Sequence, residues 1–146
     1  MKTLKKLGHA VQPVAVRDEL TPIRHAIEEW HPDIVFNLLE EFLGREEFDH
    51  HVDSYLELMQ MPYTGCNPRG LVLTRDKALS KKLIAFHHLT VPKFAVFERG
   101  RRVHRPKSLD FPLIVKSLVH EASLGIAQAS IVDSDEKLRE RVAFHR

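Results

Sequence analysis

The stretch Pro112-Leu113-Ile114-Val115-Lys116-Ser117-Leu118-Val119-His120-Glu121-Ala122-Ser123-Leu124-Gly125-Ile126 decides how the second half of this chain is expected to fold. An apolar run ends at Lys116, a short polar loop follows, and a second apolar run begins at Ile126. Short apolar runs of this kind predict strands, and side chains alternate along a strand. Lys116 is therefore expected to point to the same side as Ile114, with its amine beside a small loop.

The lysine and its loop have two interpretations. A buried ammonium without a partner is costly, and a phosphate would supply the partner. Ser123 offers a hydroxyl, Gly125 lets the backbone approach a ligand closely, and Glu121 lies in the same turn. Alternatively, the segment is a surface hairpin whose lysine extends into water. The spacing alone favours the hairpin, because a single glycine is weak evidence for a phosphate loop.

The composition of the 146-residue chain is that of an ordinary globular protein of one domain or two small lobes. Lys and Arg number 22 against 20 Asp and Glu, so the formal charge of +2 gives no strong attraction to nucleic acid or an anionic membrane. No apolar run approaches the roughly 18 residues of a membrane-spanning helix, and the basic N-terminus lacks the apolar core of a secretion signal. The single Cys66 cannot form an internal disulfide, which fits a cytoplasmic location.

Helices alternate with strands in the first half of the predicted structure. Helices are expected over residues 2–7, 21–30 and 48–59, with Thr21 as an N-cap before Pro22. Strands are expected over residues 10–16 and, as a buried parallel strand, over 34–36. This alternation predicts a parallel sheet covered by helices.

The second half is predicted to be an α+β lobe that follows a turn-rich seam at residues 62–68. Asp76 can cap a helix that carries Leu79, Leu83 and Phe86 on one face. Strands are expected over 91–97, 113–117 and 126–131, with a turn at Arg99-Gly100, and a last helix opens with the acidic residues 133–136. The two lobes are assigned to residues 1–66 and 67–146.

Lys77 is a second candidate for anion contact, because it lies in the first turn of a predicted helix, where backbone N–H groups favour anions. A solvated first-turn lysine is the simpler interpretation. For metal binding, the only plausible side-chain pair is His50 with Asp53, which falls short of the four ligands of a typical structural site. We therefore assign no metal ligand and no catalytic residue.

A basic patch surrounds the turn expected at Arg99-Gly100. Its members are Arg99, Arg101, Arg102, His104, Arg105 and Lys107. The patch could contact nucleic acid, but it has no interleaved aromatic residues and the rest of the chain is nearly neutral. A solvated hairpin tip is the favoured interpretation, and a nucleic-acid-binding module is the weakest of the functional alternatives.

Four segments together resemble the D-alanine–D-alanine ligase branch of the ATP-grasp superfamily. In chain order they are residues 33–38 (DIVFNL), 61–66 (MPYTGC), 74–81 (TRDKALSK) and 111–126. Each is short, but their order and spacing extend over nearly the whole chain. The Glu-Ala-Ser-Leu-Gly loop is closer to uncharacterised ligase-like members than to the ligases of cell-wall synthesis.

The resemblance implies an α/β fold, with a Rossmann-like pre-ATP-grasp lobe followed by the small α+β lobe of the ATP-grasp clamp. It also implies an ATP- and Mg²⁺-dependent ligase that phosphorylates an amino-acid-like or other carboxylate and lets an amine attack the acyl phosphate. By similarity, Lys77 and Lys116 would contact the nucleotide. Glu121, Ser123 and Gly125 would belong to the loop over the phosphates.

The chain departs from the family pattern in three ways. The opening strand with its glycine-rich turn is absent, so the chain is expected to start in the helix that follows. Residues 38–44 (LLEEFLG) stand where the cell-wall ligases carry a substrate-contacting histidine, which argues against D-alanine as substrate. The large C-terminal lobe that supplies the Mg²⁺ ligands is also missing.

We therefore expect the N-terminal part of such a ligase, truncated at both ends and inactive by itself. The alternative is a degenerate, non-enzymatic protein that binds a partner. Unpaired sheet edges and bare apolar faces would make the isolated chain poorly soluble or self-associating.

Overall fold

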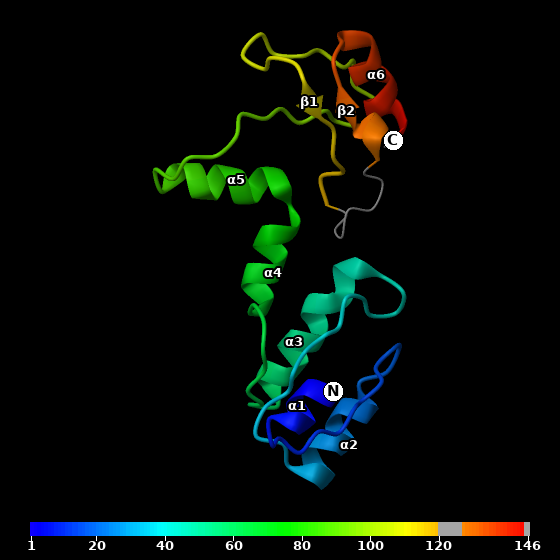
Figure 1. The fold of residues 1–146 in the computed structure, drawn as a ribbon, viewed down its shortest axis with the longest axis vertical. Helices are drawn as coiled ribbons and strands as arrows, with labels where there is room; N and C mark the ends of the chain where they lie inside the picture. Colours follow the sequence, from blue (N-terminus) through cyan, green and yellow to red (C-terminus); the bar gives the residue numbers. More distant parts are fainter. Residues whose placement is uncertain (120–126, 145–146) are drawn as a thin grey trace. The chain divides into compact units, whose positions relative to one another are not determined.

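The computed structural model describes residues 1–119 and 127–144. The chain divides into two compact units, Met1–Leu71 and Val72–Arg146, each considered by itself (Figure 1). In chain order the elements are α1 (Lys2–Lys6), α2 (Thr21–Trp30), the 3-10 turn η1 (Glu46–Phe48), α3 (Asp49–Leu58), α4 (Pro68–Arg75), α5 (Lys77–Phe86), β1 (Leu113–Ile114), the 3-10 turn η2 (Gln128–Ser130), β2 (Ile131–Val132) and α6 (Asp135–Phe144). The boundary between the units falls within α4.

The core of the first unit forms where α2 and α3 present their apolar faces. Its buried residues are Ile23 from α2, Phe42 from the connection, and Val52 and Leu56 from α3. Val52 and Leu56 are four residues apart, so they lie on one side of α3. Partly buried side chains complete this core: Val16, Leu20, Ile27, Val35, Leu39, Phe48, Tyr55, Met61 and Tyr63.

The core of the second unit forms between a two-stranded antiparallel sheet and α6. Leu113 pairs with Val132 and Ile114 with Ile131, and the Val115 amide extends the pairing by donating to the Ser130 carbonyl at 2.8 Å. Val132 is buried against Leu138 and Val142 of α6. Phe97, Val103, Phe111, Leu113 and Val115 pack around them.

The helices predicted from apolar periodicity and capping signals are confirmed. α1 ends before Gly8, which has a φ of +90°, a conformation that glycine adopts without strain. α2 is preceded by Leu20 at the cap position, so the prediction of Thr21 as the N-cap is wrong by one residue, and Pro22 still lies in the first turn. α2 ends at Trp30, and His31 follows it in the left-handed conformation.

The strand predictions are the part of the fold that fails. The described backbone over residues 10–16 and 91–97 forms no strand, although both segments are rich in valine or phenylalanine. Residues 34–36 contribute one parallel bridge, Val35 to Tyr63, and Ile34 and Phe36 are exposed. A strand exists only where a neighbour accepts its backbone hydrogen bonds, which composition does not reveal.

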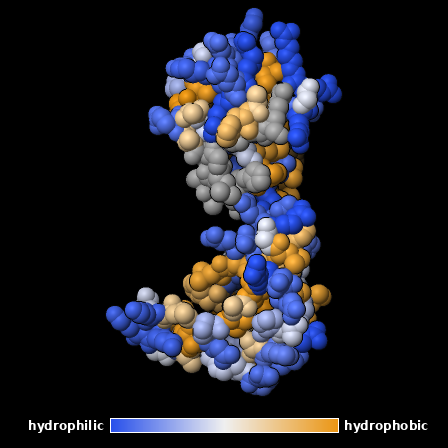
Figure 2. Space-filling model, turned by 90° about the vertical axis from the view of Figure 1, so that its right-hand side faces the viewer, coloured by the Kyte–Doolittle hydropathy of each residue, from blue (hydrophilic) through white to orange (hydrophobic). Residues whose placement is uncertain are grey.

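The protein is thus mixed α/β, with one small antiparallel sheet among the described residues. Of the strand predicted over 113–117, residues 113 and 114 are in β1. The strand predicted over 126–131 begins outside the described residues, and η2 and β2 follow at 128–132. Apolar side chains reach the surface in both units (Figure 2). None of the helices in the described ranges is long and apolar enough to span a membrane.

Candidate functional site

The two lysines singled out in the sequence belong to neighbouring segments of the second unit. The Lys77 backbone amide donates to the Leu118 carbonyl at 3.2 Å, and the Lys77 Nζ lies 3.5 Å from the same oxygen. Leu118 is two residues beyond Lys116. The N-terminus of α5 is therefore held against the segment that leaves β1.

Lys116 is exposed, and so is Ile114, whereas Leu113 and Val115 are partly buried against the second core. The predicted alternation, with Lys116 on the same side as Ile114, is confirmed. Because this side faces solvent, the lysine does not need a buried partner. The amine is accessible, as an ammonium that meets a soluble phosphate must be.

The N-terminus of α5 is formed by Asp76, as predicted. Its carboxylate Oδ1 accepts hydrogen bonds from the amides of Ala78 and Leu79, at 2.8 and 2.9 Å. The cap satisfies two of the four N–H groups that a helix leaves unpaired at its start. Asp76 also places a negative charge next to Lys77, so positive potential there comes from the lysines and not from the helix end alone.

The predicted loop residues Glu121, Ser123 and Gly125 lie outside the described residues, so their roles remain predictions. Lys77 and Lys116 as nucleotide contacts are predictions of the same kind. The structure brings the segments of the two lysines together and leaves the lysine amine of one of them exposed.

A polar network in the first unit was not predicted from the sequence. Asn37 donates from Nδ2 to Asp53 Oδ1 at 2.6 Å, and its own Oδ1 accepts from the Leu39 amide at 2.9 Å. The Asn37 amide donates to Thr64 Oγ1 at 3.0 Å. One asparagine therefore joins the segment after the Val35 bridge to α3 and to the turn at Thr64. The segment 33–38, which carries part of the family resemblance, could have indicated Asn37. The apolar periodicity did not indicate Asp53, which lies on the apolar side of α3.

Burial changes the ionisation of two groups near this network. The Asp53 carboxyl is 3% exposed, and its burial raises its pKa, against a lowering by the Asn37 hydrogen bond. Tyr63 donates its hydroxyl to Glu57 Oε1 at 3.0 Å. Burial and the bond to Glu57 raise the pKa of Tyr63 to about 12. Both groups therefore lose their protons at a higher pH than they would in water.

The described residues do not assemble a metal site. No three His, Cys, Asp or Glu side chains in ranges 1–119 and 127–144 lie close enough together to hold an ion. The only candidate pair from the sequence is split, since Asp53 bonds Asn37 and the Nδ1 of His50 lies 3.8 Å from Asp49 Oδ1.

The basic patch predicted around residue 100 is partly engaged within the protein. Gly100 has a φ of +81° and the Arg101 amide donates to the Glu98 carbonyl at 3.2 Å, so the predicted turn is present, although the 91–97 strand that should lead into it is not. Arg105 pairs with Asp135 at 2.8 Å, donates to the Leu109 carbonyl and stacks on Phe111. Its guanidinium is therefore part of the fold of the second unit and not a solvated contact.

Sequence comparison identifies relatives over most of the chain. It is 30% identical over 137 residues to the D-alanine–D-alanine ligase of Syntrophotalea carbinolica, covering 94% of this chain and 42% of that enzyme. It is 32% identical over 139 residues to the D-alanine–D-alanine ligase of Geobacter sulfurreducens, covering 94% of this chain and 41% of that enzyme. A Sinorhizobium fredii protein called "Uncharacterized protein y4sG" is 38% identical over 93 residues, which are 64% of this chain and 27% of that protein.

The chain therefore spans less than half the length of these curated relatives. No protein-family model matches the sequence, and no solved structure matches it. The similarity to the ligases runs through both compact units and agrees with the resemblance carried by the four short segments. The chain is homologous to D-alanine–D-alanine ligases over most of its own length, consistent with a ligase-like fragment of the ATP-grasp superfamily.

Proposed function

We propose that this chain supplies part of an ATP-dependent carboxylate–amine ligase, with Lys77 and Lys116 as nucleotide contacts. The ligase relatives support the reaction class. The observation that carries the site is the double contact of Lys77 with the Leu118 carbonyl, two residues after Lys116. This contact joins the start of α5 to the segment two residues after Lys116, and Glu121, Ser123 and Gly125 follow that segment in the sequence.

The architecture proposed for this function is a Rossmann-like lobe over residues 1–66 and the small ATP-grasp lobe over 67–146. The β1–β2 sheet covered by α6 supports the second assignment, since Lys116 follows β1 by two residues. Support for the first is the parallel bridge between Val35 and Tyr63, with α2 and α3 packed in the same core.

In the complete enzyme, a carboxylate oxygen of the substrate would attack the γ-phosphorus of ATP, and ADP would leave. An amine nitrogen would then attack the acyl carbon, the C–O bond to phosphate would break, and a C–N bond would replace it. The role that we propose for the residues described here is electrostatic. Lys77 and Lys116 would offset phosphate charge from fixed positions, which is the main demand of phosphoryl transfer.

The Mg²⁺ that the family uses does not fit the residues described here, because they assemble no group of three ligands. We propose that its ligands belong to a part of the complete protein that these residues do not include. A cytoplasmic location is proposed with the same function. The proposed substrate is an amino-acid-like or other carboxylate, and D-alanine is not specified, because residues 38–44 lack the histidine of the cell-wall ligases.

Calorimetric titration of the chain with a non-hydrolysable ATP analogue tests the site. Lys116→Ala should weaken binding about tenfold or more, as expected when a charge-assisted contact worth about 1.5–3 kcal/mol is lost. Lys82→Ala is the matched control, because Lys82 is an exposed lysine on α5 away from its first turn. Binding unaffected by Lys116→Ala, or equally weakened by Lys82→Ala, would remove the site assignment.

A second assay tests catalytic completeness. The chain is expected to release no ADP from ATP and Mg²⁺ when amino acids are added, because a γ-phosphate without a metal clamp is poorly neutralised. Amino-acid-dependent ADP release by these 146 residues would overturn that expectation and leave the family assignment intact.

A further inference from the structure

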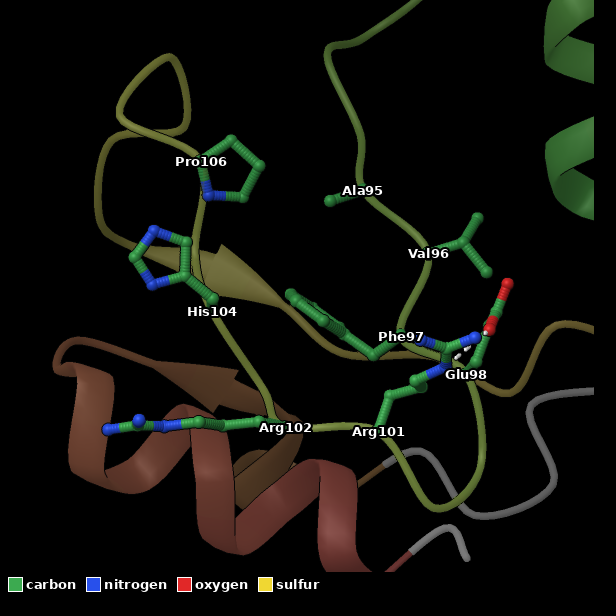
Figure 3. A pocket seen from close by; sticks show the side chains of 8 residues that line it. All are labelled: Ala95, Val96, Phe97, Glu98, Arg101, Arg102, His104 and Pro106. Atoms are coloured by element: carbon green, nitrogen blue, oxygen red, sulfur yellow. Dashed lines mark ion pairs between the residues drawn. The ribbon is translucent and has the colours of Figure 1, made fainter.

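A shallow hollow of about 410 Å³ opens on the second unit around residues 95–106 (Figure 3). Apolar groups line one part of it and cationic groups another. The lining residues are Ala95, Val96, Phe97, Glu98, Arg101, Arg102, His104 and Pro106. Neither Lys77 nor Lys116 is among them, so the hollow is separate from the proposed nucleotide contacts.

A second hollow of about 180 Å³ shares two of these residues, Arg102 and His104. Its remaining walls include Leu138 and Arg139 of α6, together with Arg105 and Asp135. Arg102 and His104 thus line both the larger hollow, which has an apolar wall on one part, and the smaller, strongly basic one. In Figure 3 the Arg102 side chain extends away from Arg101.

The charges around the two hollows do not cancel. Two carboxylates are available, and each has a partner: Glu98 pairs with Arg101 at 3.4 Å, and Asp135 pairs with Arg105 at 2.8 Å. Arg102 and Arg139 line the same 180 Å³ hollow, and neither forms an ion pair with any residue in the described ranges. Among the described residues, Arg102 and Arg139 thus line one small concavity without an ion pair of their own, and the Asp135 carboxylate in that concavity is already paired with Arg105.

Like charges in one concavity repel each other, and an anion between them would remove that repulsion. Arginine suits phosphate in particular, since its planar fork donates two parallel hydrogen bonds to the oxygens. The adjoining wall of Val96, Phe97 and Pro106 offers apolar contact to whatever carries the phosphate. A concavity of a few hundred Å³ matches a small molecule.

We propose that Arg102 and Arg139 form an anion site for a small phosphorylated molecule whose apolar part rests in the hollow beside Phe97. Nucleic acid is the less favoured ligand. The net charge of +2 gives the chain no strong overall attraction to a polyanion, and Arg101 and Arg105 of the same patch are already paired.

The test is a titration of the whole chain with phenyl phosphate, followed by amide chemical shifts in ¹H–¹⁵N spectra. Shifts are expected at residues 95–106 and in α6, and Arg102→Ala combined with Arg139→Ala should weaken binding at least tenfold. Arg99→Ala is the control, because Arg99 is an exposed arginine of the same patch that lines neither hollow. Both arginines are exposed, so the variants should keep the circular dichroism of the parent.

Three companion measurements identify the chemistry. Inorganic phosphate should bind more weakly than phenyl phosphate, and phenol should not bind measurably. Lys116→Ala should leave phenyl phosphate binding unchanged, so a failure of the nucleotide proposal is distinguishable from a failure of this one. No shift at residues 95–106, equal weakening by Arg99→Ala, or binding of a single-stranded oligonucleotide in preference to phenyl phosphate would overturn the proposal.

Discussion

α3 and α5 are both ten-residue helices with an apolar face that the sequence predicts, yet they are stabilised in opposite ways. α3 has no side-chain cap, but Val52 and Leu56 are 3% and 1% exposed in the first core. α5 has a cap with two hydrogen bonds from Asp76, but Leu79 and Leu83 remain 40% and 38% exposed.

The difference shows that apolar periodicity predicts a helix without predicting what covers it. A ten-residue helix is marginal in water by itself, so it depends either on tertiary burial or on strong local signals. α3 depends on burial and α5 on its cap and the contact of its first residue with Leu118. Substitutions at matched positions of the two helices should therefore have very different effects.

Truncation of matched leucines gives the largest expected contrast. Leu56→Ala should lower the free energy of unfolding of the first unit by about 2–5 kcal/mol, because it leaves a cavity in a packed core. Leu83→Ala should change stability by no more than about 0.5 kcal/mol, since Leu83 is 38% exposed and belongs to neither buried core. Urea denaturation followed by circular dichroism measures both. Equal losses would mean that the face of α5 is buried in solution.

Asn37→Ala tests the polar tie between α3 and the rest of its unit. The change removes the bonds to Asp53 and Leu39 and leaves a buried carboxylate without its amide partner. The expected loss is about 1–3 kcal/mol. Denaturation of Asn37→Ala beside Gln12→Ala, an exposed polar control, measures it. A loss no greater than that of the control would show that the network contributes nothing to stability.

Asp76→Ala tests the dependence of α5 on its cap. Loss of the two bonds to the Ala78 and Leu79 amides should cost about 1 kcal/mol. Hydrogen exchange should report it as faster exchange in the first turns of α5, with α3 unchanged. Asp110→Ala, an exposed carboxylate outside any helix, is the control. Faster exchange in α3 as well would show that the cap stabilises more than one helix.

The sequence was sufficient for α1, α2, α3, α5 and α6, because capping and periodicity are local, but it did not predict α4. Asp76 lies two residues before the first amide that it bonds, and Val52 and Leu56 are four residues apart. The strands depend on partners that are distant in sequence: Val35 pairs with Tyr63, and Leu113 with Val132. Residues 10–16 and 91–97 have the composition of strands, but the described backbone gives them no neighbour.

The candidate site was only partly predictable, because it too depends on contacts between residues that are distant in sequence. Lys77 and Lys116 were identified from short motifs. The sequence did not show that the Lys77 amide donates a hydrogen bond to the Leu118 carbonyl, two residues after Lys116. Asp53 was considered only as a metal-binding partner of His50, and its bond to Asn37 was not predicted, because a carboxylate on the buried side of a helix contradicts the apolar pattern. Its partner is an asparagine 16 residues away.

Asp53→Asn is the smallest and most diagnostic change to α3. Burial raises the pKa of Asp53 in the folded state above its unfolded value. The folded protein therefore binds this proton more tightly, so stability from this group is present at low pH and is lost as pH rises through the raised pKa. Asparagine keeps an acceptor for Asn37 Nδ2 and carries no charge. The variant should be slightly more stable than the parent at pH 7 and equal to it below about pH 4. Its stability should also depend less on pH between these two values.

Asp33→Asn, on an exposed side chain, should leave the profile of stability against pH unchanged. Denaturation midpoints across this pH range measure the difference. A variant less stable than the parent at pH 7 would mean that the charge on the Asn37 hydrogen bond outweighs the burial of the carboxylate.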